Sequence, residues 1–266
     1  MKLGLLLALS LAFSACSGAA VNKSTNNASA KTNSTNANST PTVTAAKVTI
    51  DSPDGVKLIS TYLPASKPNS PALLLLHQWQ SDRHSYDDFA KQMHERGFAV
   101  LAIDGRGFGE STKKADGSTV APGRTDADVK AMLGDVDAAY NYLAKQPNVD
   151  ASKIGLVGAS YGSSLAIIYA ADHSEVAAVA LLSPGRDYFG NMPTEPAVEK
   201  YGNRPLFMVA ANDDAESASA VKKLGGDGSN QNYQTKIYEK GGHGTALFKV
   251  GLAYELGKFL SSSLQK

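Results

Sequence analysis

A serine, a carboxylate and a histidine follow one another along the second half of the chain, in surroundings that suit nucleophilic catalysis. They are Ser160 in GASYG (158–162), Asp213 and Asp214 after the apolar run 206–210, and His243 in GGHG (241–244). A serine hydroxyl becomes an effective nucleophile when a histidine takes its proton, and a carboxylate can hold that histidine in the required tautomer. These residue types predict acyl transfer to Ser160, with His243 as the general base and one of the two aspartates orienting it.

The serine lies in a G-x-S-x-G pattern between an apolar run at 154–157 and a helix-like segment at 163–171. A strand–turn–helix sequence of this kind holds the hydroxyl above a sheet, and the flanking glycines let neighbouring backbones pass closely. The alternative is a tight turn whose serine only caps the helix. The pattern itself is short and made of common residues, so the prediction of a nucleophile depends on the strand before it and the helix after it.

The chain offers five histidines as bases. His84, His94 and His173 lie in predicted helices or at a helix end, where a lone histidine is usually a surface residue. His243 differs because flexible glycines surround it in a loop between the last predicted strand and the last predicted helix. His243 is therefore the predicted general base. Of the two aspartates, one is expected to cap the helix that follows them and the other to orient His243.

From residue 46 onward, short apolar or β-rich runs alternate with amphipathic segments. Strands are predicted at 48–50, 56–63, 72–77, 98–103, 154–157, 176–182, 206–210 and 235–238, and helices at 82–96, 126–143, 163–171 and 246–260. This alternation predicts an α/β protein with a doubly wound, mostly parallel sheet and helices on both faces. The turn sequence SPDG at 52–55 predicts an antiparallel hairpin at one edge. Functional residues of such sheets follow the carboxyl ends of the strands.

Charge and cysteine content exclude several classes of protein. Lys and Arg total 26 and Asp and Glu total 25, which leaves a formal charge of +1 and no basic excess for binding nucleic acid. The single cysteine, Cys16, excludes a disulfide framework within the chain and a cysteine-based zinc site. No H-x-x-x-H or clustered His/Asp pattern predicts a metal-dependent hydrolase, and no cofactor is expected.

The first residues indicate export. Lys2, an apolar run at 3–13 and small residues before Cys16 are typical of a secretory signal over residues 1–15. The segment FSAC (13–16) resembles the lipobox of bacterial lipoproteins, which implies cleavage before Cys16 and lipid attachment to it, although Phe13 replaces the usual Leu. An ordinary cleaved signal is the alternative. Residues 16–45 are rich in Ser, Asn, Thr and Ala and predict a disordered tether. We therefore expect an exported protein of the bacterial cell envelope, anchored to the membrane through Cys16.

Residues 46–266 resemble the α/β-hydrolase superfamily. The resemblance is carried by the GASYG turn and by the chain order Ser160, Asp214, His243. The family's G-x-x-D pattern falls on ANDD (211–214), which favours Asp214 over Asp213, and Asp187 is a weaker third candidate because some members place their acid after the preceding strand.

The same resemblance implies an oxyanion hole and a scaffold loop. The backbone N–H of Tyr161 is expected to act with that of Gln78 or Trp79, because HQW (77–79) stands where the family usually carries His-Gly-x. His77 is expected to brace this loop rather than act as a base. The segment DGRGFGES (104–111) resembles the family's D-x-R-G-x-G-x-S loop and is expected to be scaffold.

Together these features predict a serine hydrolase that cleaves small-molecule carboxylic esters of short or medium acyl length through an acyl-enzyme. Residues 183–205 are too few for a large helical lid, so an open site is expected, with Tyr188, Phe189 and Met192 either lining it or packing in the core. Dienelactone hydrolases share this minimal architecture but use a cysteine nucleophile, so Ser160 argues against their chemistry. A peptidase or amidase of the same fold and an inactive binding protein remain as alternatives. The sequence gives no indication of the oligomeric state.

Overall fold

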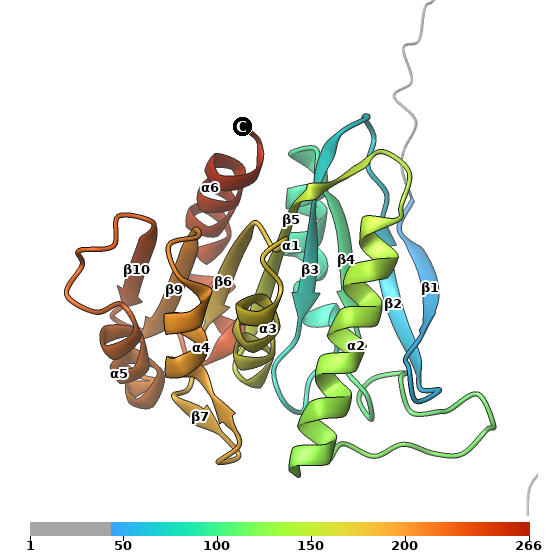
Figure 1. Ribbon diagram of the computed structural model, residues 1–266. Helices are drawn as coiled ribbons and strands as arrows, with labels where there is room; N and C mark the ends of the chain where they lie inside the picture. Colours follow the sequence, from blue (N-terminus) through green and yellow to red (C-terminus); the bar gives the residue numbers. More distant parts are fainter. Residues whose placement is uncertain (1–43) are drawn as a thin grey trace, which may run out of the picture. The chain divides into compact units, whose positions relative to one another are not determined.

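The computed structural model describes residues 44–266, which form an α/β structure around one large sheet (Figure 1). Its strands are β1 (Ala46–Asp51), β2 (Lys57–Leu63), β3 (Ser70–Leu76), β4 (Ala99–Ile103), β5 (Val149–Ala159), β6 (Ala178–Leu182), β9 (Leu206–Ala211) and β10 (Tyr233–Tyr238). The helices are α1 (Asp87–Glu95), α2 (Asp126–Ala144), α3 (Tyr161–Asp172), α4 (Thr194–Tyr201), α5 (Ala215–Leu224) and α6 (Leu252–Leu264).

The strands lie in the order β1-β2-β4-β3-β5-β6-β9-β10. The β1–β2 and β2–β4 pairs are antiparallel, and the other five pairs are parallel. The predicted mostly parallel sheet with an antiparallel hairpin at one edge is therefore confirmed. Every residue of β3, β4, β6 and β9 is buried, as expected for continuous apolar strands that are covered on both faces.

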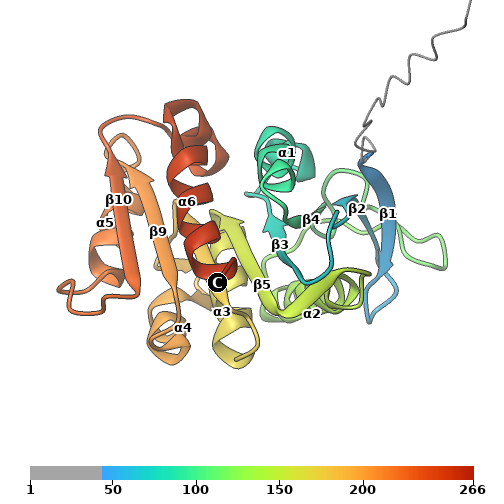
Figure 2. The same ribbon diagram turned by 90° about the horizontal axis from the view of Figure 1, so that it is seen from above.

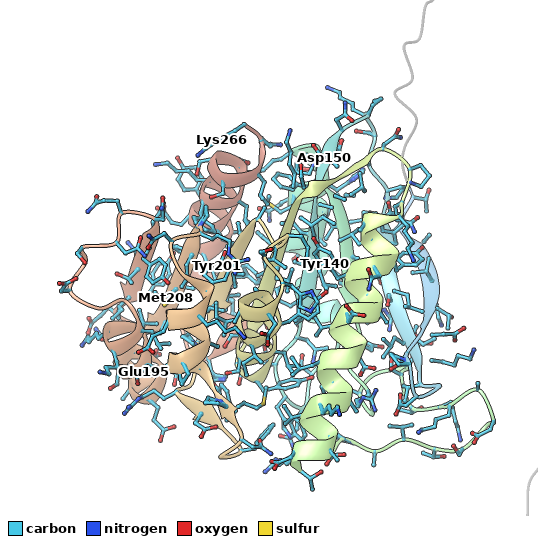
Figure 3. All side chains as sticks on the ribbon, in the orientation of Figure 1. Tyr140, Asp150, Glu195, Tyr201, Met208 and Lys266 are labelled. Atoms are coloured by element: carbon cyan, nitrogen blue, oxygen red, sulfur yellow. The ribbon has the colours of Figure 1, made fainter. Side chains whose placement is uncertain are left out.

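Helices cover both faces of the sheet, as the view from above shows (Figure 2). Along β3, Leu74 and Leu76 pack into the core under α2 to α5, while Leu73 and Leu75 pack into the core under α1 and α6. This alternation follows from the two-residue period of a strand. Aromatic contacts add to the first of these cores. The ring centroids of Tyr140 in α2 and Tyr169 in α3 are 5.8 Å apart, and Figure 3 labels Tyr140 among the side chains between these helices. The predicted doubly wound architecture is confirmed.

The structure departs from the predicted elements near the carboxyl ends of the last strands. The segment predicted as one helix at 246–260 is a 3-10 helix (Gly244–Val250) followed by α6, because Gly251 adopts a left-handed φ of 93° between them. Residues 183–205, predicted as a lidless connection, contain a small hairpin of β7 (Asp187–Tyr188) and β8 (Met192–Pro193) and the short helix α4. Neither element has enough residues to show a periodic pattern in the sequence.

The predicted signal segment 1–15, Cys16 and all but the last two residues of the predicted tether at 16–45 lie outside the described residues. Within residues 44–266, no helix has both the length and the apolar character needed to cross a bilayer.

Candidate active site

The three residue types predicted to act together all follow carboxyl ends of strands in one half of the sheet. Ser160 follows β5, Asp214 follows β9 and His243 follows β10, and these strands lie within a run of parallel neighbours, β5-β6-β9-β10. Parallel strands end at the same edge of a sheet, and this edge is where open α/β sheets carry their sites. The topology therefore brings three distant chain segments to one place.

Ser160 occupies a strained turn directly before α3. Its φ of 54° and ψ of −126° lie outside the regions that non-glycine residues usually adopt. The turn is held because the Ser160 N–H donates to the Leu182 carbonyl of β6 at 2.8 Å and the Ser160 carbonyl accepts from the Ser163 N–H at 2.8 Å. Only 5% of the residue is exposed. Because the hydroxyl makes no cap hydrogen bond to α3, the alternative of a capping serine does not describe this turn.

The two glycines beside the serine are required by close backbone packing. A Cβ on Gly162 would lie 2.6 Å from the carbonyl oxygens of both Leu76 and His77, at the end of β3. A Cβ on Gly158 would lie 2.7 Å from the Ser163 Cα and closer still to the Gly162 carbonyl. The obstacles are backbone atoms, which cannot rotate away as a flexible side chain can. The G-x-S-x-G pattern thus lets β3, β5 and α3 meet at the serine.

Replacing Gly158 by alanine is expected to lower the free energy of unfolding by about 3 kcal/mol, the upper end of the usual cost of overpacking, because the new methyl group meets backbone. Gly134→Ala provides the control: it lies within α2, where a Cβ would meet only Pro53 at 3.7 Å. There we expect a gain of up to about 1 kcal/mol, because alanine has the higher helix propensity. Urea unfolding of both variants checks the contrast, and equal effects at the two glycines would contradict it.

The carboxylate that contacts His243 is Asp214. His243 Nδ1 lies 2.7 Å from Asp214 Oδ2, and because a carboxylate only accepts, Nδ1 carries the proton and Nε2 is left as the basic nitrogen of the neutral ring. The side chains of His243 and Asp214 are 43% and 15% exposed, so the ring is open to solvent while the carboxylate is sheltered.

Asp213 has a different partner set. Its carboxylate accepts hydrogen bonds from the N–H groups of Gly241 and Gly242 at 3.1 to 3.3 Å, and these bonds lower the pKa of Asp213. Neither aspartate makes a side-chain cap for α5, so the expectation that one of them caps this helix was wrong. Asp187, the third candidate, accepts from the Met192 N–H at 2.7 Å and so supports the β7–β8 hairpin.

The hydroxyl of Ser160 lies beside the phenol of Tyr188. Burial raises the pKa of Tyr188, and the neighbouring hydroxyls of Ser160 and Ser217 oppose part of that rise. The Tyr188 hydroxyl also donates to the Ser183 carbonyl at 3.0 Å. Among the hydrogen bonds of residues 44–266, none joins Ser160 to the His243 ring. Hydrogen bonds between a nucleophile and its base commonly tighten only when substrate binds.

The candidate oxyanion donors lie on two elements. Tyr161 is the first residue of α3, where backbone N–H groups have no partner within the helix and can donate to an anion. Gln78 and Trp79 lie in residues 77–83, here called the oxyanion loop, which runs from the end of β3 to the 3-10 helix Arg83–Tyr86. The structure brings this loop next to α3, since the Trp79 and Tyr161 ring centroids are 5.3 Å apart.

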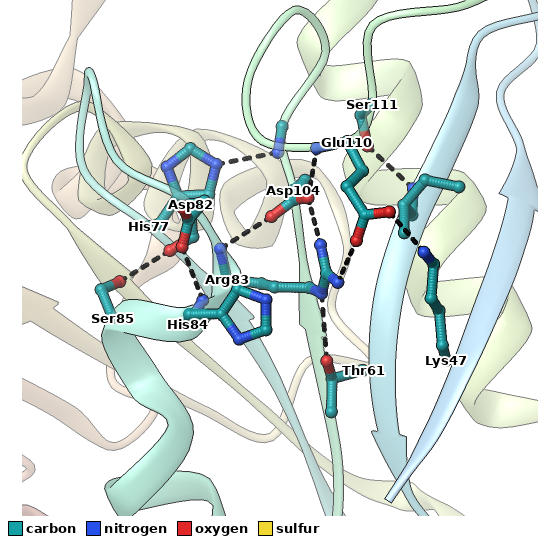
Figure 4. Close-up of polar contacts among 12 residues, drawn as sticks. Lys47, Thr61, His77, Asp82, Arg83, His84, Ser85, Asp104, Glu110 and Ser111 are labelled. Atoms are coloured by element: carbon teal, nitrogen blue, oxygen red, sulfur yellow. Dashed lines mark hydrogen bonds and ion pairs between the residues drawn. The ribbon is translucent and has the colours of Figure 1, made fainter. Parts of the chain in front are cut away.

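Both ends of the oxyanion loop are attached to the loop that follows β4 (Figure 4). At one end His77 Nε2 accepts from the Gly105 N–H at 2.9 Å, so Nδ1 carries the proton that is donated to the Gln78 carbonyl at 2.7 Å. At the other end the nearly buried Arg83 pairs with the buried Asp104. The expectation that His77 braces this loop agrees with these contacts.

Residues 104–111 form hydrogen bonds and ion pairs that hold the neighbouring loops, as expected for a scaffold segment. Asp104 accepts from the backbone N–H groups of Arg83 and Glu110, each at 2.8 Å, and Glu110 pairs with Arg83 and Lys47 (Figure 4). Arg106 donates two hydrogen bonds to the buried Asp135, at 2.6 and 2.7 Å. A bidentate pair of this kind fixes orientation as well as charge.

The buried imidazole of His77 predicts a pH dependence of stability. Burial lowers the pKa of His77 below the ordinary value of 6.5, so the unfolded chain takes up this proton first as the pH falls. Stability from His77 is therefore complete above pH ~6.5 and decreases below it. We expect the wild-type Tm to fall more steeply between pH 7 and pH 5 than that of His77→Gln, which keeps a donor and an acceptor but does not titrate. Parallel slopes in differential scanning calorimetry would contradict this.

Aromatic side chains from three segments form a wall beside α3. The Trp79 ring lies 4.8 Å from the rings of both Phe108 and Phe189, and the Arg124 guanidinium lies 4.8 Å above Trp79 and 5.0 Å above Phe189. Of the residues expected to line the site, Phe189 belongs to this wall, whereas Met192 is fully buried in the core.

A groove of about 970 Å³ opens beside this candidate acid–base pair. Its lining includes His243, Asp214, Tyr188, Ser217 and two prolines, Pro193 and Pro196. The connection between β6 and β9 contains only the β7–β8 hairpin and α4, so it supplies no large helical lid. Within residues 44–266, no three His, Cys, Asp or Glu side chains are grouped so that they could hold a metal ion.

Ser183 was not singled out from the sequence, although it contacts the histidine loop, defined as residues 241–245. Its Oγ is buried and accepts from the Gly244 N–H at 2.9 Å, and its own φ is 48°. Its place directly after β6, next to β5 in the sheet, is the signal that could have identified it, because site residues follow the carboxyl ends of strands.

Comparisons with known proteins agree with this architecture. Residues 59–251 match the profile of the dienelactone hydrolase family. A Mycobacterium tuberculosis protein named as uncharacterized is 30% identical over 195 residues, covering 66% of this chain and 65% of that protein. A polyketide transferase of Penicillium sp is 27% identical over 193 residues, 65% of this chain and 63% of its own length. The chain thus spans just under two thirds of the length of these curated relatives.

A solved structure shows the same fold. An esterase of Pyrococcus furiosus superposes with a TM-score of 0.64 at 18% identity, over 84% of this chain and 92% of its own.

Proposed function

The chain belongs to the dienelactone hydrolase family, and within it we propose that this chain is a serine hydrolase that cleaves carboxylic esters of short or medium acyl length. The family gives the fold, while Ser160, in place of the cysteine expected of dienelactone hydrolases, gives the proposed chemistry. The observation that carries the proposal is the 2.7 Å contact between His243 and Asp214 at the sheet edge where Ser160 occupies its strained turn. An alcohol, an imidazole and a carboxylate in this chain order and on these strand ends suit acyl transfer.

In the proposed reaction Ser160 attacks the ester carbonyl while Nε2 of His243 takes the hydroxyl proton. Asp214 holds the Nδ1–H and stabilises the imidazolium that forms. The N–H of Tyr161, together with that of Gln78 or Trp79, stabilises the negative oxygen of the tetrahedral intermediate, each by about 3 kcal/mol. The imidazolium then protonates the leaving alkoxide, which departs as the alcohol. Water attacks the acyl-enzyme by the same steps, and the acid is released.

The surroundings of the site support an ester substrate of moderate size. The partly exposed rings of Trp79 and Phe189, which lie under the Arg124 guanidinium, offer apolar surface to an acyl or alkyl group. The open groove beside His243 has room for the other half of an ester. The groove lining combines Tyr188 and two prolines with serine hydroxyls and, besides Asp214, with four charged side chains, those of Arg186, Asp187, Glu195 and Glu216. It therefore suits esters whose second half is polar.

The direct test is to treat the full-length protein with a fluorophosphonate and to locate the adduct by mass spectrometry. We expect modification at Ser160, and hydrolysis of nitrophenyl esters from acetyl to octanoyl that declines with longer acyl chains. Faster hydrolysis of aminoacyl amides than of esters would identify a peptidase or amidase. Absence of an adduct at Ser160 would contradict the proposal and would favour a binding protein on an inactive hydrolase fold.

The sequence of residues 1–16 supports a separate proposal, that the protein is exported to the bacterial cell envelope and lipidated at Cys16. The mass of the mature N-terminal peptide tests it, since cleavage before Cys16 with acyl groups attached is expected. An unmodified Cys16, or a start at another residue, would contradict this proposal without affecting the first.

A further inference from the structure

The side chain of Gln78 links two loops that are far apart in the sequence. Gln78 Oε1 accepts two hydrogen bonds from Thr245, one from its backbone N–H at 3.0 Å and one from its hydroxyl at 2.9 Å. Thr245 lies two residues after His243, in the histidine loop. Gly244 leaves the space for this link, because a Cβ there would lie 2.7 Å from Gln78 Oε1.

Two further side chains, which follow the neighbouring strands β9 and β6, also hold the histidine loop. Asp213 accepts from the N–H groups of Gly241 and Gly242, before the histidine, and Ser183 accepts from the N–H of Gly244, after it. Asp213 follows β9 and Ser183 follows β6. The contact from Gln78 differs because it comes from the oxyanion loop, across the site.

The oxyanion loop is a firm anchor for this link. One of its ends is fixed by the hydrogen bond from the Gly105 N–H to His77, and the other by the buried ion pair of Arg83 and Asp104 (Figure 4). Gln78 lies between these attachments, so its amide oxygen has a defined position relative to the backbone N–H groups of the same loop.

We propose that Gln78 is a positioning residue for His243: through Thr245, its side chain sets the distance between the base and the candidate oxyanion donors. This role rests on the proposed serine hydrolase function. The α/β-hydrolase pattern has glycine at this position, which has no side chain to reach the histidine loop. The link is therefore a feature of this chain and is separate from the backbone N–H that Gln78 or Trp79 offers to the oxyanion.

A change at Gln78 should act on turnover more than on substrate binding. Neither Gln78 nor Thr245 lines the groove, so the contacts that the groove makes with the bound substrate remain. His243, however, loses a contact that fixes the position of its loop, and a displacement of a catalytic group by about 1 Å can lower a rate by about 10²-fold. Loss of the acceptor also leaves the Thr245 N–H without its protein partner, which exposes this amide to solvent exchange.

The test compares two substitutions in the full-length protein. Gln78→Met keeps the length of the side chain and removes the acceptor, whereas Gln78→Glu keeps the acceptor. In Gln78→Met we expect amide hydrogen exchange of residues 241–250 to accelerate about tenfold and kcat for an acetyl ester to fall about 10- to 100-fold with KM nearly unchanged. In Gln78→Glu we expect the amides of residues 241–250 to keep their wild-type protection from hydrogen exchange. We also expect most of kcat to be recovered at alkaline pH.

A matched control is Gln146→Met, which removes a hydrogen bond of similar length, 3.0 Å to the Tyr142 carbonyl at the end of α2. It should change neither the exchange of residues 241–250 nor kcat. A wild-type rate of amide exchange in Gln78→Met would show that the Gln78–Thr245 hydrogen bonds do not hold the histidine loop. A wild-type rate of exchange together with a low kcat in Gln78→Glu would show that Gln78 does not act by positioning His243. If the wild type hydrolysed no ester, the proposed function would fail, while the exchange result would still decide the link.

Discussion

Ser160→Ala is expected to lower kcat for ester hydrolysis by roughly 10⁴- to 10⁶-fold, because the variant has no group that can form the acyl-enzyme. The oxyanion donors and the groove remain, so weak hydrolysis by bound water should persist. We expect the Tm to stay close to that of the wild type, since both hydrogen bonds that hold this turn use the backbone N–H and carbonyl of residue 160. Stopped-flow measurement with nitrophenyl acetate gives the rate, and differential scanning calorimetry gives the Tm.

Ser164→Ala is the matched control for this variant. Ser164 lies in α3, the helix that Ser160 precedes, and is fully buried, and its hydroxyl contacts that of Thr194 at 2.7 Å. Its loss should cost about 1 kcal/mol of stability, the typical net value of one hydrogen bond, and leave kcat nearly unchanged. Retention of wild-type turnover by Ser160→Ala, or an equal loss in both variants, would show that Ser160 is not the nucleophile.

Asp214→Asn is expected to lower kcat by about 10⁴-fold, while Asp213→Asn lowers it by about tenfold or less. An asparagine at 214 can present its NH₂ group to His243 Nδ1, which favours the tautomer with the proton on Nε2 and so removes the base. An asparagine at 213 still offers a carbonyl oxygen to the N–H groups of Gly241 and Gly242, so the histidine loop keeps an anchor.

Comparing these two variants distinguishes a direct contact with His243 from a contact with the backbone of the histidine loop. Steady-state kinetics of both variants across pH 5 to 9 give the measurement, with circular dichroism to confirm folding. If Asp213→Asn were the more damaging change, Asp213 would be the acid and the 2.7 Å contact of Asp214 would not describe the working site. Equal, small effects would contradict a carboxylate–histidine pair altogether.

The fold could be predicted well from the sequence because its strands are unusual in composition. Runs such as ALLLL in β3 and AVALL in β6 are apolar at every position, which indicates a strand buried on both faces. The order of the strands was not predicted, since it depends on which helix crosses which face. The β7–β8 hairpin and α4 were missed because two-residue strands and an eight-residue helix leave no periodic signal.

The site could be predicted in its residue types but not in its contacts. The GASYG turn and the glycines around His243 are local signals, so Ser160 and His243 stand out from the sequence. The preference for Asp214 over Asp213 comes from the resemblance to the family's G-x-x-D pattern. The residues alone leave the choice open, because it depends on the directions in which two adjacent side chains leave one loop. The link from Gln78 to Thr245 spans 167 positions, and no local pattern could have indicated it.

The backbone at residue 160 also limits which nucleophiles this fold can accept. With φ at 54°, a side chain branched at Cβ would be crowded, so threonine is a poor replacement. Cysteine has the same branching as serine and would fit the turn without moving the glycines beside it. The backbone at residue 160 can therefore hold either a serine or a cysteine. The two differ in one side-chain atom, so the same fold can present an alcohol or a thiolate as its nucleophile.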